Sequence, residues 1–157
     1  GNILASDDDI EKFILQFISS DELAKVKRYL PEVLSCLLSD SGYNGYFGVD
    51  MMIYEHNGVM RLNPCMELNL RMNMGMVSRL FFDRYVAVGC KGEYRVGFFK
   101  KPGEAYALHI ADSTAYPLEM EDGKITSGYI NLSPVTENSC YTASAIIYKE
   151  KSIGELY

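Results

Sequence analysis

The sequence contains no run of about 18 consecutive apolar residues, the length at which a membrane-spanning helix is read from sequence. Near its start it carries Asp7, Asp8 and Asp9, where a secretory signal peptide would be basic and then apolar. We therefore expect no membrane span and no secretion signal, and we predict a cytoplasmic protein.

Positive charge is also scarce. The 15 Lys and Arg residues stand against 21 Asp and Glu residues, which gives a net charge of −6. This balance argues against duplex nucleic acid or an anionic membrane as the main partner. It leaves room for a small phosphorylated ligand, because such a site requires only local cations.

Close cysteine pairs are absent as well. The four cysteines lie far apart in the sequence, form no CxxC pair and have no neighbouring histidine at a zinc-ligand spacing. We expect reduced thiols, which agrees with a cytosolic location.

What is present is enough for one folded domain, since 157 residues can bury roughly two thirds of the unfolded surface. Helical spacing of apolar residues predicts a helix from about Asp7 to Ser19 and a second one that begins with Ser20 as its cap. Pro31 would end this helix, kink it, or open a third helix as its first residue. A glycine-bearing connector follows.

Beyond the connector the pattern changes to alternation. A helix is predicted again over 72–86, and a tight hairpin turn in the segment MEDGKI. The predicted strands after that helix are Tyr94 to Phe99, Ala115 to Met120, Ile125 to Leu132 and Tyr141 to Tyr148. Helices followed by antiparallel strands indicate an α+β fold with a mainly antiparallel sheet.

The segment Gly48 to Gly75 places acid, amide and guanidinium groups among apolar residues. Asn57-Gly58 is a strong signal for a two-residue type I′ hairpin turn. Uninterrupted pairing outward from this turn sets His56 opposite Val59 and Asp50 opposite Cys65.

In this register the side chains divide into two faces, because neighbouring residues of a strand point to opposite sides. The first face is mostly polar and holds Asp50, Met52, Tyr54, Arg61, Asn63, Cys65, Glu67 and Asn69. The second is apolar apart from Glu55 beside the turn, and we expect it to pack: it holds Val49, Met51, Ile53, Met60, Leu62, Pro64, Met66 and Leu68.

The polar face predicts a metal site. Glu67 would lie diagonally from Asp50, about 7–8 Å away between neighbouring backbones, so both carboxylates could reach one cation. With the amide oxygen of Asn69 they form a set of hard oxygen ligands of the kind that Mg²⁺ accepts. A hairpin whose polar face is merely solvated would show the same alternation.

The stretches GVDMMIY and ELNLRMNMG resemble the end of the ATP-grasp fold, the family of ATP-dependent carboxylate-amine and carboxylate-thiol ligases. The matching pattern covers about residues 45 to 75. The interval from Asp50 to Glu67 is longer than is typical of that family, and Leu70 stands where a proline is frequent. The resemblance implies that Asp50, Glu67 and Asn69 hold Mg²⁺ (or Mn²⁺), and that Arg71 steadies phosphate or an acyl-phosphate intermediate.

The resemblance also implies a domain organisation. Residues 1–157 would be a single partial domain, the C-terminal lobe of the fold, with a helical segment at 1–41, the metal-site hairpin at 45–69, a helix at 72–86 and the remaining strands over 94–149. The family grips ATP between two lobes, with lysines and a glycine-rich lid on strands that precede this region.

The predicted function is that of an ADP-forming ligase lobe that uses Mg²⁺ and ATP to activate a small carboxylate for attack by an amine or similar nucleophile. We expect the longer protein to be the enzyme and the isolated chain to be inactive and a poor ATP binder. Truncation would expose apolar surface and favour a homodimer. The alternative is a non-catalytic binding or scaffold domain with the same fold.

Overall fold

The computed structural model describes residues 1–149 and 153–156, and its fold is α+β with mainly antiparallel pairing, as predicted. The chain forms two compact units. We call Asp7–Met76 the hairpin unit, and Gly1–Ser6 with Val77–Tyr157 the sheet unit. Among the residues described, none of the helices combines the length and apolar character that crossing a membrane demands.

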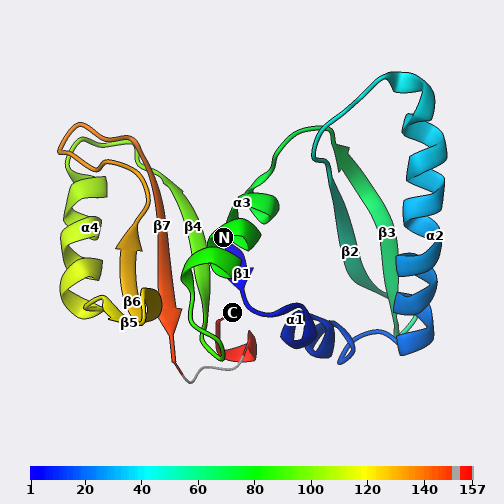
Figure 1. Ribbon diagram of the computed structural model, residues 1–157, viewed down its shortest axis with the longest axis horizontal. Coiled ribbons are helices and arrows are strands. Elements are labelled where there is room, and N and C mark those ends of the chain that lie inside the picture. The colour runs from blue at the N-terminus through cyan, green and yellow to red at the C-terminus, as the bar shows by residue number, and fades with distance from the viewer. Residues whose placement is uncertain (150–152, 157) are drawn as a thin grey trace. The chain divides into compact units, whose positions relative to one another are not determined.

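The sheet unit contains a five-stranded sheet whose strand order is β1-β4-β7-β6-β5, with every neighbouring pair antiparallel (Figure 1). The strands are β1 (Asn2–Leu4), β4 (Lys91–Phe98), β5 (Glu119–Glu121), β6 (Lys124–Asn131) and β7 (Tyr141–Tyr148). The predicted strands at Tyr94, Ile125 and Tyr141 are therefore confirmed. A short 3₁₀ helix, η2 (Ile153–Leu156), follows them.

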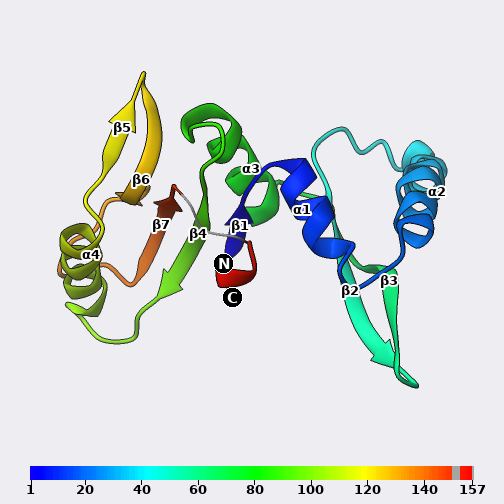
Figure 2. The same cartoon turned by 90° about the horizontal axis from the view of Figure 1, so that it is seen from below.

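The turn between β5 and β6 confirms the hairpin predicted from MEDGKI, and Figure 2 shows the two strands extending together. Asp122 and Gly123 both have positive φ, at 51° and 77°. Positive φ at both central residues is the property of a type I′ turn, which matches the twist of the strands that it joins.

One face of this sheet packs into the core of the unit. Alternating residues of β4 and β7, among them Tyr94, Ala145 and Ile147, meet Phe81 of helix α3 (Met74–Tyr85) and Val86 just after it. Ala145 and Ile147 are almost completely buried, so this layer is closely packed.

The opposite face meets helix α4 (Glu104–Ala115), which the sequence did not predict. The strand predicted over Ala115 to Met120 is wrong at its start, because Ala115 is the last residue of α4 and β5 begins only at Glu119. The helical stripe of α4 consists of Ala105, Leu108, His109 and Asp112, at positions i, i+3, i+4 and i+7. Two of these four are polar, and this obscured the apolar period.

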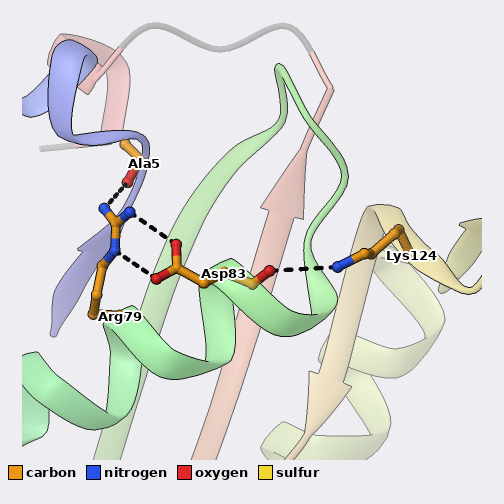
Figure 3. A network of polar contacts seen from close by, with 4 residues as sticks. All are labelled: Ala5, Arg79, Asp83 and Lys124. Atoms are coloured by element: carbon orange, nitrogen blue, oxygen red, sulfur yellow. Dashed lines mark hydrogen bonds and ion pairs between the residues drawn. The ribbon is translucent and has the colours of Figure 1, made fainter.

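Helix α3 is tied to its surroundings at its C-terminal end (Figure 3). Lys124 donates from Nζ to the carbonyl oxygens of Arg84 (2.6 Å) and Asp83 (3.4 Å), which have no further helical turn to bond. Arg79 pairs with Asp83 through Nη2 and Oδ1 at 2.8 Å and donates to the carbonyl of Ala5 at 3.4 Å. The network thus links α3 to β6 and to the segment after β1.

The hairpin unit begins with α1 (Asp7–Ile14) and α2 (Ser20–Leu38), followed by the 3₁₀ turn η1 (Ser39–Ser41). Ser19, and not Ser20, caps α2, since its hydroxyl accepts from the amide of Glu22 at 3.2 Å. Pro31 lies inside this one continuous helix. The remaining elements are β2 (Gly48–His56) and β3 (Val59–Asn69), a two-stranded sheet beside α2 (Figure 1).

Removal of the Lys124 ammonium tests the capping of α3. We expect Lys124→Met to lower the free energy of unfolding of the sheet unit by about 1 kcal/mol, because two helix-end carbonyls lose their donor. Urea unfolding followed by amide NMR signals of α3 and β6 measures this.

Lys100→Met is the matched control, because Lys100 is exposed and its side chain makes no hydrogen bond within the described residues. An equal loss of stability in the two variants would contradict the capping role.

Candidate functional site

The turn between β2 and β3 has the predicted geometry. Asn57 and Gly58 have φ values of 52° and 77°, and His56 pairs with Val59. Pairing then continues in the predicted register as far as Met52 opposite Asn63. The turn therefore determines the register of the outer half of the hairpin.

The inner half is shifted. Three residues of β3, Pro64 to Met66, lie between Asn63 and Glu67, whereas β2 has only Met51 between Asp50 and Met52. Asp50 consequently lies directly opposite Glu67. The predicted pairing of Asp50 with Cys65, and the diagonal position of Glu67, are wrong.

Two side-chain properties explain this bulge. Pro64 has no amide hydrogen to give to a strand ladder, so an insertion or an edge position suits it. Asn63 satisfies the irregular backbone instead, because its Oδ1 accepts from the amide of Cys65 at 3.2 Å. Its Nδ2 also lies 3.0 Å from the sulfur of Met66. The side-chain amide of Asn63 thus bridges the inserted segment.

The insertion changes the pairing by an even number of residues, so each side chain keeps its face. Asp50 and Glu67 share a face as direct partners, and Asn69 lies on the same face two residues further along β3. Opposite residues of an antiparallel pair have Cβ atoms about 4.5–5.5 Å apart, closer than the diagonal arrangement. The structure therefore brings the predicted residues together more tightly than uniform pairing would.

A chain of hydrogen bonds joins three of the four predicted site residues. Arg71 donates from Nη2 to Oδ1 of Asn69 at 3.1 Å, and Asn69 donates from Nδ2 to Oδ2 of Asp50 at 3.3 Å. The backbone turns immediately after β3, because the amide of Arg71 donates to the carbonyl of Asn69 at 2.9 Å. This turn returns the guanidinium to the end of the hairpin.

Glu67 is the fourth predicted residue, and its exposed carboxylate has no hydrogen bond or ion pair within residues 1–149 and 153–156. Asp50 is also exposed and has only one oxygen engaged by a side chain, whereas Asn69 is half-buried. Both carboxylates therefore retain free oxygen lone pairs that face solvent.

Helix α2 holds the hairpin from one side. Glu22, in its first turn, accepts from the amide of Leu62 at 3.0 Å, and Leu34 of the same helix is buried. The apolar face as a whole packs less completely than predicted. Leu68 is half-buried, but Met51 and Met66 remain 45 % and 53 % exposed, because Met66 lies in the bulge and a single long helix accompanies this sheet.

Gly48 and Asn73 hold the inner end. Asn73 accepts from the amide of Met76 through Oδ1 at 2.9 Å, which makes it the N-terminal cap of α3. Its Nδ2 would lie only 1.6 Å from a Cβ atom placed on Gly48. Only a glycine opposite Asn69 therefore leaves room for this cap.

The donor set fits a hard divalent cation in its chemistry. Two carboxylates and an amide oxygen are ligands that Mg²⁺ accepts, and a carbonyl oxygen has two lone pairs, so Oδ1 of Asn69 could bind a cation while it accepts from Arg71. Across the described part of the chain, no group of three or more His, Cys, Asp or Glu side chains could hold a metal ion. Any cation here would depend on the amide and on ligands from outside this chain.

Sequence reasoning identified the four polar residues but missed Asn63 and Asn73, which position them. Each had a local signal. Asn63 directly precedes a proline inside a predicted strand, where an irregularity is expected. Asn73 stands three residues before Met76 at the start of a helical pattern, the spacing of an N-cap.

No protein-family model, curated protein or solved structure matches this chain.

A methyl group on Gly48 tests the arrangement of the inner end. Gly48→Ala should displace Asn73 and uncap α3, with a loss of about 1–2 kcal/mol in the free energy of unfolding. Urea unfolding followed by amide signals of β2 and α3 measures it. Gly154→Ala is the control, because a Cβ there meets no atom of the described residues within 4 Å.

A double-mutant cycle with Asn73→Ala makes this prediction specific. Because the two changes remove the same cap, their combined cost should be clearly smaller than the sum of the single costs. Additive costs would show that Gly48 acts without Asn73.

Proposed function

We propose that this chain is the C-terminal lobe of an ATP-dependent, Mg²⁺-dependent ligase of the ATP-grasp type. Such an enzyme activates a carboxylate as an acyl phosphate, which an amine or similar nucleophile then attacks with release of phosphate. The proposal rests on the resemblance over residues 45 to 75 and on the geometry of the hairpin. It concerns the longer protein, and the isolated lobe would be inactive.

One observation supports it most: Asp50 lies directly opposite Glu67, and both share a face with Asn69, which links Asp50 to Arg71. Carboxylates, amide and guanidinium are the groups that phosphoryl transfer requires, since its catalysis consists of positioning and charge neutralisation. Here they meet at the inner end of a hydrogen-bonded hairpin, where a bulge and a capped helix hold the backbone.

Each residue has a distinct proposed role. Asp50, Glu67 and Asn69 would hold Mg²⁺, which when bound supplies charge neutralisation for phosphate oxygens. Arg71 would bind a phosphate oxygen, because the hydrogen bond to Asn69 uses only one of its five N–H donors. Asn69 would orient both neighbours, since it donates to Asp50 and accepts from Arg71.

The alternative is a non-catalytic binding or scaffold domain with an ATP-grasp-like fold. It is favoured by the small number of carboxylates, because the described residues hold no group of three acidic, cysteine or histidine ligands. The two functions differ in what Glu67 does: a scaffold would not need its carboxylate, whereas the ligase would.

Glu67→Gln in the longer protein separates the two. We expect the rate of ADP formation with Mg²⁺ to fall about 100-fold or more, because loss of even an outer partner of a metal ligand costs about 10–100-fold. The second measurement uses Mn²⁺ in place of Mg²⁺ and records paramagnetic broadening of the amide signals of Asp50, Glu67 and Asn69, which should weaken in the variant.

Glu55→Gln is the matched control, because Glu55 lies on β2 of the same hairpin, pairs with Met60 and points to the other face. It should leave ADP formation and broadening unchanged. Full ADP-forming activity in Glu67→Gln would overturn the ligase proposal and leave the scaffold function.

A further inference from the structure

The face of the five-stranded sheet that meets α4 carries several polar side chains. Glu93 and Arg95 of β4 lie on it, and in the register Arg95 pairs with Ser144 and Gly97 with Thr142 of β7. Ser144 and Thr142 are each only 8 % exposed. Polar groups buried under a helix indicate a binding or structural role more strongly than exposed ones do, because a buried polar group without a partner costs free energy.

A pocket of about 420 Å³ opens beside this polar layer, within the sheet unit. Its walls include Glu93 and Arg95 from β4, Thr142 and Ser144 from β7, and Leu108 and Asp112 from α4. This volume is in the range of small-molecule sites, which run from about 300 to 1,000 Å³. The wall carries two carboxylates and one guanidinium, so it presents both signs of charge.

Glu93 holds the guanidinium of Arg95 in place and leaves some of its N–H donors unused. Its Nε and Nη2 both reach Oε2 of Glu93, at 2.6 and 2.5 Å. No other ion pair or side-chain hydrogen bond engages it within the described chain, so the edge formed by Nη1 and Nη2 is available. That edge matches a carboxylate in a bidentate pair.

The charge of this guanidinium is secure. Burial acts to lower the pKa of Arg95, but the hydrogen bond and charge of Glu93, together with the charges of Tyr148 and Asp112, outweigh burial and raise that pKa. Arg95 therefore stays cationic, and Glu93 orients it.

Asp112 supplies the opposite charge on the other wall. Its side chain is half-buried, and its carboxylate has no hydrogen bond or ion pair among the residues that the structure describes. The nearby His109 bonds elsewhere, because its Nδ1 lies 3.1 Å from the hydroxyl of Tyr129. The charge of Asp112 also contributes, after burial, to the raised pKa of Tyr129.

We propose that this pocket binds a small α-amino acid, with its carboxylate on the free edge of Arg95 and its ammonium group against Asp112. A zwitterion supplies a partner of the right sign to both groups at once. A nucleotide or another polyanion fits poorly, because the carboxylates of Glu93 and Asp112 both line this pocket. The inference concerns the sheet unit alone and does not depend on the proposed ligase function.

The test titrates the chain with each standard amino acid and follows binding by calorimetry and by amide NMR shifts. We expect at least one amino acid to bind and to shift signals of β4, β7 and α4. Asp112→Asn and Arg95→Lys should each weaken that binding about tenfold or more, since each loses a charge-assisted hydrogen bond. Asp122→Asn and Arg61→Lys, which lie outside the pocket, should leave it unchanged.

Two single-charge probes, acetate and ethylamine, complete the test. Each should bind at least about tenfold more weakly than the amino acid, because each engages only one wall. Asp112→Asn keeps the shape of the side chain, and its melting curve serves as the check on folding. Absence of binding by every amino acid, equal binding of a single-charge probe, or undiminished binding in both pocket variants would overturn the proposal.

Discussion

Pro64 cannot give an amide hydrogen to the ladder between β2 and β3, and the arrangement of the polar residues depends on how the chain accommodates it. The side chain of Asn63 accepts from the amide of Cys65 and contacts the sulfur of Met66. The inserted segment therefore leaves the strand ladder while the amide of Cys65 keeps a hydrogen-bond partner. Pairing resumes with Glu67 opposite Asp50. Because the insertion is even, polar and apolar residues keep their faces, and the two carboxylates become direct neighbours.

The other contacts of the hairpin unit preserve this arrangement. Two-stranded sheets are marginally stable alone, and here α2 supports one through the bond from Leu62 to Glu22. At the inner end, the missing side chain of Gly48 admits Asn73, which begins α3. The site residues therefore project from a segment that is held at both ends, which is the condition for binding groups to keep their mutual geometry.

The sequence predicted most clearly those features that depend on local chemistry. Asn57-Gly58 and Asp122-Gly123 specified their turns, since few other residues adopt positive φ, and alternation located β6 and β7.

The sequence did not predict the features that depend on a residue far away in the chain or on a polar partner. Helix α4 turns His109 and Asp112 toward a polar sheet face, so no apolar period marked it. The sequence does not predict the shift at Pro64, because the turn by itself indicates an uninterrupted ladder. The face shared by Asp50, Glu67 and Asn69 was nevertheless correct, because it depends on parity and not on the exact register.

The shifted register is the central claim, and nuclear Overhauser effects between protons of β2 and β3 test it directly on the unaltered chain. We predict cross-strand effects between Asp50 and Glu67, and between Met52 and Asn63, with none between Asp50 and Cys65. Effects between Asp50 and Cys65, with Glu67 opposite Gly48, would show uninterrupted pairing. They would contradict the account of how this hairpin brings its carboxylates together.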